Sequence, residues 1–297
     1  MGVLVPAISG LSDGVLLFLV ASGLTLIFGV MGILNFAHGG MFMLGAYFGY
    51  VVASALNTSS LWLFVLVVVL ATAAIGGVSL AVERVVFRRL YQLSELHALL
   101  GTYALLLILE GAAQLIWGLR PLSEALPAQL SGFYTLGDTD VPVYSLLLLA
   151  MGAIVLGFLQ WLVYGTHFGQ DLRDVAEDGL MARLMGVDTK TVFQVTVIIG
   201  TMMAGLGGAL AAPTLALTPD VAGSFIIQAF AVVIIGGMGS IYGSLVAALL
   251  VGVFNSVLVA YAPGLAGYSL YIVLAAVLLL RPRGLLGSMA LEEAQRS

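Results

Sequence analysis

The sequence predicts an all-α, polytopic membrane protein, a bundle of about eight to nine transmembrane helices with broken or re-entrant segments. Of its 297 residues, 61% are hydrophobic and only 8% are charged, whereas a soluble domain carries about 25% charged residues. Four long stretches contain no Asp, Glu, Lys or Arg: 14–82, 141–170, 191–219 and 221–280. About 20 consecutive apolar residues suffice to cross a bilayer. A soluble fold of this size would lack the charge to cover its surface.

Nine hydrophobic segments follow from these runs. The run 221–280 alone has room for about three. In chain order the segments are 4–29, 38–56, 61–82, 97–118, 142–164, 191–213, 222–238, 240–261 and 266–281. Helices are expected because lipid offers no hydrogen-bond partners, so each backbone polar group must be satisfied within the segment. A barrel would show alternating ten-residue strands instead. Segment 222–238 is short and ends at a glycine cluster, so it is either a full span or a re-entrant helix.

The distribution of basic residues predicts the orientation of the chain. They fall into three groups, which are Arg84, Arg88 and Arg89, then Arg173, Arg183 and Lys190, then Arg281, Arg283 and Arg296. Lys and Arg are enriched in cytoplasmic loops, and nine spans put all three groups on one side. The remaining basic residue, Arg120, lies in an outer loop with Glu124, Asp138 and Asp140. The prediction is therefore an N-terminus outside and a C-terminus in the cytoplasm.

Residues 165–190 form a charged loop that is too polar to span and too short to be a domain. It holds eight of the 25 charged residues of the chain. Between them, apolar residues recur at helical spacing, which predicts one short amphipathic helix ending near Gly186. This helix is either a solvated loop helix without a partner or a coupling helix that docks into a cytoplasmic partner.

Ionisable residues at membrane depth are functional candidates by default. Glu110 lies within segment 97–118, and Gln114 follows one turn later on the same face. Glu110 either faces a permease interface or water-filled path, or makes a structural hydrogen bond to a neighbouring helix. Asp13, near the outer end of the first segment, is interpreted as interfacial.

A polar break separates the first two segments and holds Asn35 and His38. Irregular backbone at membrane depth is tolerated where it is buried in protein or lines a cavity, and transporter sites form at broken helices. The alternative is a cytoplasmic turn whose histidine caps a helix. Together with Gln228, these residues complete the candidates for a translocation pathway: Asn35, His38, Glu110, Gln114 and Gln228.

Glycine is abundant, with 37 residues. Small residues four apart let helices approach closely in lipid, and such pairs are Gly45 with Gly49, Gly200 with Ala204, and Gly239 with Gly243. They serve either tight packing or helix sliding and breaks during transport. The candidates for helix breaks or close packing are Gly39, Gly40, Gly236, Gly237 and Gly239.

Several activities are excluded by residues that the sequence lacks. There is no cysteine, so thiolate metal sites, disulfides and cysteine nucleophiles are ruled out. A lone histidine without companions at ligand spacing is no metal site. The basic residues form no footprint for nucleic acid. There is no G-x-x-x-x-G-K-[ST] phosphate loop, and the single lysine, Lys190, does not follow a glycine. ATP hydrolysis must therefore come from another chain.

Three blocks of sequence resemble the permeases of branched-chain amino acid ABC importers. The first is the run 22–40, with its Asn-Phe-Ala-His-Gly core, which is similar to the smaller of that family's two paralogous permeases. The second joins the pattern Arg173-x4-Asp178-x3-Ala182-x-Leu184-x-Gly186-Val187 to the block 229–240, and the third is the terminal run 281–287. The resemblance covers nearly the whole chain in order.

The resemblance implies an assembly around one transmembrane permease domain, residues 1–297, with a coupling-helix loop at about 165–190. Its partners would be a second permease, paralogous or another copy, two cytoplasmic ATPase subunits and a periplasmic binding protein, all in or at the bacterial inner membrane. ATP and Mg would bind the ATPases, with no cofactor in this chain. The implied coupling residues are Arg173, Asp174, Glu177, Asp178, Ala182, Arg183 and Gly186.

The solute stays open between branched-chain amino acids and related small polar molecules. Two positions depart from the family pattern, because Gln228 stands where a lysine is usual and Asp174 where an alanine is usual. The competing interpretation is a secondary transporter driven by an ion gradient, with Glu110 and the broken segments as its sites. An intramembrane enzyme is disfavoured because there is no paired acid and base or metal cluster.

Overall fold

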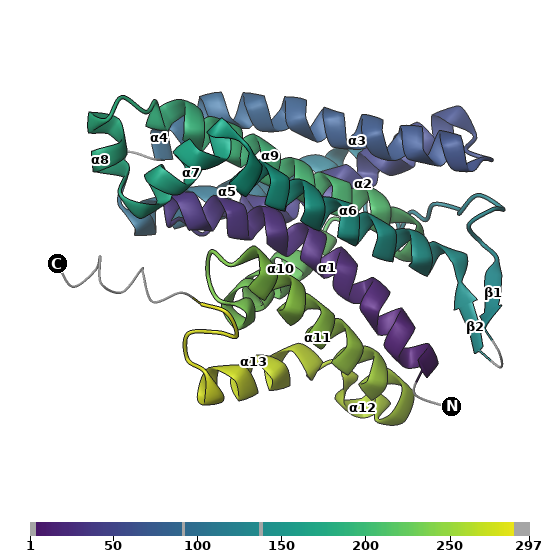
Figure 1. Ribbon diagram of the computed structural model, residues 1–297. Helices are drawn as coiled ribbons and strands as arrows, with labels where there is room; N and C mark the ends of the chain where they lie inside the picture. The colour runs from purple at the N-terminus through teal and green to yellow at the C-terminus, as the bar shows by residue number, and fades with distance from the viewer. Residues whose placement is uncertain (1–3, 91–92, 137–138, 288–297) are drawn as a thin grey trace.

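A computed structural model describes residues 4–90, 93–136 and 139–287 of the chain as a helical bundle (Figure 1). Within these ranges, seven helices are long and apolar enough to cross a membrane. They are α1 (Leu4–Met31), α2 (Ala37–Leu56), α3 (Leu61–Val82), α5 (Glu95–Trp117), α6 (Val143–Gly165), α9 (Thr189–Ala211) and α11 (Ile241–Tyr261). The predicted fold class is therefore confirmed.

The other two predicted segments are also helices, but short ones. Helix α10 (Val221–Gly236) has 16 residues and α13 (Ser269–Leu280) has 12. At 1.5 Å per residue they measure about 24 and 18 Å, less than the roughly 30 Å of a hydrocarbon core. The last segment, predicted from 266, corresponds to α13, which begins at Ser269 after the four-residue helix α12 (Pro263–Ala266) and a turn.

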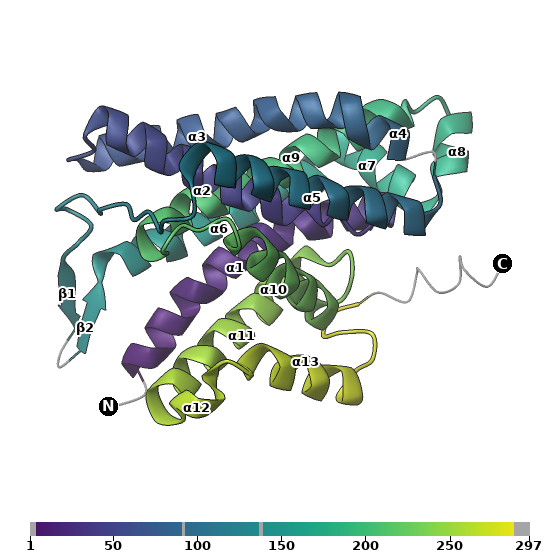
Figure 2. The same ribbon diagram turned by 180° about the vertical axis from the view of Figure 1, so that it is seen from behind.

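The connecting elements gather at the two ends of the bundle. A hairpin of β1 (Phe133–Leu136) and antiparallel β2 (Thr139–Pro142) lies at one end. At the other end lie the π-helical turn η1 (Glu83–Phe87), α4 (Arg88–Leu90), α7 (His167–Glu177) and α8 (Gly179–Leu184) (Figures 1 and 2). The first two predicted basic groups, at 84–89 and 173–190, thus share one end. Arg296 and Asp138 lie outside the described residues.

The core of the bundle is built around α1, α2 and α9. Helix α1 packs against α6, α9, α10 and α11, and α2 packs between α3, α5, α9 and α10. Helix α1 is covered on most sides, and most of its circumference is apolar. The outer helices α3, α5, α6 and α11 instead expose large apolar side chains such as Trp62 and Leu115. Such faces suit lipid or a second membrane protein rather than water.

Small residues bring α2 and α9 into backbone contact. A Cβ added at Gly45 would lie 2.6 Å from the Cα of Gly205, and a Cβ at Gly208 would collide with the carbonyl oxygen of Phe42. In the same way, a Cβ at Gly200 would lie 2.7 Å from the carbonyl oxygen of Gly23 on α1. The geometry at these positions is that of tight packing, as expected for helices in lipid.

The glycine cluster after α10 meets the end of the described chain. Gly237 and Gly239 have φ angles of 99° and 84°, which favour glycine and end the helix. The backbone N–H groups of Leu285 and Leu286 donate to the carbonyl oxygens of Ile235 (2.8 Å) and Gly236 (3.0 Å). Residues that are 50 positions apart in the sequence are thereby joined at the end of α10.

Candidate functional site

The charged loop 165–190 folds as two helices, so the prediction of one amphipathic helix is wrong. Helix α7 ends at Glu177, and Asp178 then adopts an extended backbone with φ −150° and ψ 95°. The Asp178 carboxylate accepts hydrogen bonds from the backbone N–H groups of Leu180 and Met181, each at 2.9 Å. Asp178 therefore caps the start of α8. Gly186, with φ 95°, follows the end of α8 as predicted.

Charged side chains tie this loop to the membrane helices. The guanidinium of Arg173 donates to the carbonyl oxygen of Val163 and lies 5.3 Å from the ring centre of Tyr164, both on α6. Arg183 donates to the hydroxyl of Thr189 at 3.2 Å, at the start of α9. Of the other predicted coupling residues, Asp174 and Glu177 are exposed and Ala182 is buried. The loop is thus attached to both α6 and α9.

Asp188 closes the loop by capping α9. Its carboxylate accepts from the hydroxyl of Thr191 at 2.6 Å and from the backbone N–H groups of Lys190 and Thr191. The hydrogen bonds from Thr191, above all, hold the pKa of Asp188 below its ordinary value. Asp188 therefore stays ionised at neutral pH and keeps the first turn of α9 in place.

The outward face of α8 is apolar rather than charged. Four large side chains on and just after this helix are exposed; we call them the α8 patch, and they are Leu180 (70%), Met181 (55%), Leu184 (73%) and Met185 (78%). Exposed clusters of this kind mark interaction sites, and flexible methionines suit an adaptable protein surface. The patch was not predicted from the sequence, although four of the seven residues in the run Gly-Leu-Met-Ala-Arg-Leu-Met are large and apolar.

Two predicted pathway residues, Glu110 and Gln114, lie on α5 where it meets α10. Glu110 is half-buried, and its Oε1 would lie 3.5 Å from a Cβ added at Gly223 of α10. Gln114 is exposed one turn further along α5. The third, Gln228, is half-buried on α10 and lines a different space, with residues of α1, α11 and α13. Polar groups are costly against lipid, so this α5–α10 face is suited to water or to another protein.

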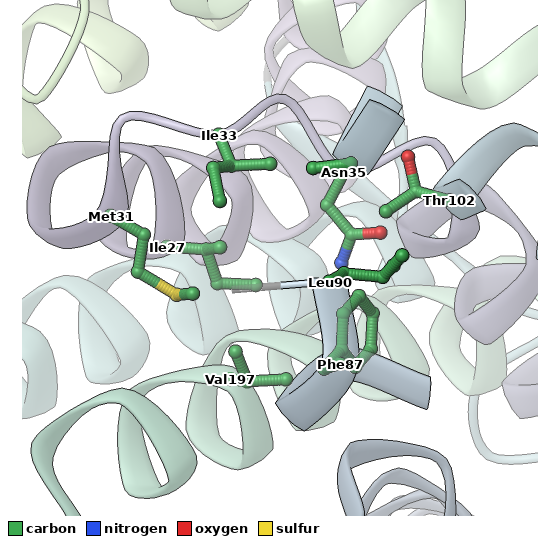
Figure 3. A pocket seen from close by; sticks show the side chains of 9 residues that line it. Ile27, Met31, Ile33, Asn35, Phe87, Leu90, Thr102 and Val197 are labelled. Atoms are coloured by element: carbon green, nitrogen blue, oxygen red, sulfur yellow. The ribbon is translucent and has the colours of Figure 1, made fainter. Parts of the chain in front are cut away.

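The other two pathway candidates lie inside the bundle. His38 is fully buried, and its Nε2 is 2.9 Å from the carbonyl oxygen of Val20. Asn35 is also buried in the non-helical link between α1 and α2, where it lines a narrow pocket with Thr102. Figure 3 shows its amide directed toward Leu90 and Phe87. A role for Asn35 and His38 in transport stays a prediction.

Two predicted glycines hold the start of α2 close to its neighbours. A Cβ at Gly39 would lie 2.7 Å from the Cβ of Ile226 on α10, and one at Gly40 would lie 2.6 Å from a methyl group of Leu109 on α5. Gly236 is equally close to α11, where its Cβ would lie 2.6 Å from the backbone nitrogen of Ser244. Gly39 and Gly40 thus allow α2 to pack closely against α10 and α5, and Gly236 allows α10 to pack closely against α11.

At the opposite end of the bundle, the connection between α5 and β1 carries a buried carboxyl group. Backbone hydrogen bonds between Leu122 and Leu217, of 3.1 and 2.8 Å, fix this connection to the segment before α10. Glu124 is only 9% exposed, and neither of its carboxyl oxygens has a partner among the described residues. Burial raises the pKa of Glu124 from 4.5 to about 7.

We expect Glu124→Gln to stabilise the protein in alkaline but not in acidic solution. A carboxyl group whose pKa is raised by folding contributes stability that is complete below about pH 4.5 and lost as the pH rises through about 7. The variant should therefore unfold a few degrees higher than the wild type at pH 8 and at about the same temperature at pH 4.5. Thermal unfolding of the detergent-solubilised protein measures this difference, and an equal shift at both values would contradict it.

Comparison with known proteins gives one family. The model of the family described as branched-chain amino acid transport system / permease component matches residues 7–281. The LivH permease of the high-affinity branched-chain amino acid transport system of Escherichia coli K12 is 29% identical, over 96% of both chains. The BraD permease of the corresponding Pseudomonas aeruginosa system is 27% identical, again over 96% of both. Among solved structures, PsaBC from Streptococcus pneumoniae is 14% identical, with a TM-score of 0.45. The alignment covers 97% of this chain and 94% of the PsaBC chain.

Proposed function

The chain belongs to the family of branched-chain amino acid transport permeases, and from this premise we propose that it forms the membrane pathway of an ATP-driven importer. Its solutes would be branched-chain amino acids or related small polar molecules, as the names of its relatives LivH and BraD suggest. The observation that carries the proposal is the α8 patch, an exposed apolar surface on a loop that is hydrogen-bonded to two membrane helices, to α6 through Arg173 of α7 and to α9 through Arg183 of α8.

ATP and Mg would be bound by two partner ATPase subunits that dock on the α8 patch. This division of labour is supported by the absence of a phosphate-binding loop from the sequence. The end of the bundle with α4, α7 and α8 would face the cytoplasm, because Arg84, Arg88 and Arg89 and the basic residues of the charged loop gather there. The N-terminus would then be outside.

A second permease, paralogous or a copy of this chain, would cover the α5–α10 face. Glu110 and Gln114 support this arrangement, because the face would then border a water-filled path between two permeases instead of lipid. A periplasmic binding protein would deliver the solute at the hairpin end. Residues 1–297 would act as one transmembrane domain with the charged loop as its only coupling element.

Uptake into proteoliposomes tests the proposed function. The chain, reconstituted with its operon-encoded ATPases, second permease and binding protein, should accumulate radiolabelled L-leucine with internal ATP and not with a non-hydrolysable analogue. The purified chain alone should accumulate none under an ion gradient. Accumulation by the chain alone would instead establish the secondary transporter.

Reporter fusions after residues 90, 130 and 180 test the orientation of the chain and should report inside, outside and inside. An outside signal at 180 would remove the basis for ATPase docking.

A further inference from the structure

A cavity of about 580 Å³ lies between α1, α10, α11 and α13, the helices that Figure 2 shows grouped on one side of the bundle. Its volume falls within the roughly 300–1,000 Å³ of typical small-molecule sites. Gln228 is the only residue lining it that the sequence singled out for the pathway. Asp13, whose side chain is exposed, also lines the cavity.

Three polar side chains of the cavity have unused hydrogen-bonding capacity. Asn255 accepts a 2.8 Å hydrogen bond from the hydroxyl of Ser269 through its amide oxygen, which leaves the amide nitrogen as a donor. In the part of the chain that the structure describes, no partner is found for that nitrogen, for the carboxylate of Asp13 or for the amide of Gln228. An acid and two amides from three different helices therefore line one space without satisfying one another.

Asp13 is an exposed side chain in the N-terminal half of α1, nine residues from the first residue of that helix. No charged residue follows it until Glu83. An unpaired carboxylate is costly against lipid, and the cost is relieved where the group faces water or a cationic ligand.

The rest of the cavity wall is aliphatic and aromatic. Leu16 and Leu17 of α1, Val251 of α11 and Leu270 of α13 are buried side chains that line it, together with Phe225 of α10. The cavity thus offers an anionic group, amide donors and an apolar wall. An α-amino acid with an aliphatic side chain has the complementary groups: an ammonium, a carboxylate and a hydrocarbon.

We propose that this cavity is a solute subsite within the permease, in which Asp13 receives the ammonium group of an aliphatic amino acid and the amides of Gln228 and Asn255 its carboxylate. The proposal rests on the proposed import function and adds a site of recognition in the permease itself. Asp13 sets the charge preference of the site, and the apolar wall receives the side chain.

Cysteine labelling tests this subsite directly, because the chain contains no cysteine. Ser224→Cys introduces a thiol on the cavity wall, and Val69→Cys introduces a control thiol on an exposed apolar position of α3. In the reconstituted complex, the thiol at position 224 should react roughly tenfold faster with a cationic than with an anionic methanethiosulfonate, as expected near a carboxylate. Addition of Asp13→Asn should remove most of that preference, and the control thiol should show none.

Ligand protection completes the test. Millimolar L-leucine should slow labelling at position 224, whereas leucinol, which lacks the carboxylate, and 4-methylpentanoate, which lacks the ammonium, should protect several-fold less. Equal labelling rates with and without Asp13, or no protection by leucine, would overturn the subsite. ATP-driven leucine uptake by the same proteoliposomes separates the two proposals: uptake without protection rejects the subsite alone, and a wild-type complex that takes up no leucine rejects the proposed function.

Discussion

The double substitution Leu184→Glu and Met185→Glu is expected to release the ATPase subunits and to reduce ATP-driven uptake by about tenfold or more. Both side chains belong to the α8 patch and are more than 70% exposed, so their replacement leaves the packing of the chain unchanged. Buried in an interface, two carboxylates without partners would be strongly unfavourable. Co-purification of the ATPases with the tagged permease and leucine uptake into proteoliposomes measure the two effects.

A matched control for the α8 patch is available at the other end of the molecule. Phe133 and Tyr134 of β1 are also large and exposed, and the hairpin lies far from α8 (Figure 1). Phe133→Glu with Tyr134→Glu should leave ATPase co-purification at the wild-type level. If the α8 variant retained both its ATPases and its uptake, the α8 patch would not be the docking surface.

The second large effect is expected for Gly208→Leu, which should eliminate most of the folded protein. A side chain at this position would collide with the carbonyl oxygen of Phe42, and its Cβ would lie 2.9 Å from the backbone nitrogen of Ala46. These are backbone atoms of α2, so no rotamer change removes the clash. Overpacking alone costs about 1–3 kcal/mol, and separation of α2 from α9 would also open the centre of the bundle. Monodisperse yield after solubilisation measures the loss.

Gly157→Leu is the control for this prediction. Gly157 lies in α6, and nothing would lie within 4 Å of a Cβ added there. The same substitution should therefore leave the yield near that of the wild type. A similar loss for both variants would attribute the effect to glycine in general, and wild-type yield of Gly208→Leu would show that α2 and α9 are not packed as described.

The membrane segments were predictable because burial in lipid imposes one simple requirement, a long uncharged apolar helix. Segments 38–56 and 240–261 differ from α2 and α11 by one residue at one end. The lengths of α10 and α13 were less predictable, because glycine and proline turns at their ends depend on packing against other parts of the chain. The bonds from Leu285 and Leu286 to the end of α10 are an example.

Local chemistry explains what the sequence analysis missed in the charged loop. Helical spacing of Leu172, Val175 and Ala182 suggested one helix, but the side chain of Asp178 competes for the backbone N–H groups that a continuous helix would use. Arg173, one of the predicted coupling residues, donates to the carbonyl oxygen of Val163 on its own chain, a contact that the sequence did not predict. The polar residues of the cavity were not foreseen as a group because Asp13, Gln228 and Asn255 are far apart in the sequence.

The attachment of the charged loop on both sides has a mechanical consequence. Arg173 fixes α7 to the end of α6, and Arg183 fixes α8 to the start of α9. Helix α9 runs from there into the middle of the bundle, where it packs against α1, α2 and α3. A movement of this loop would therefore act directly on the outer helix α6 and on the central helix α9.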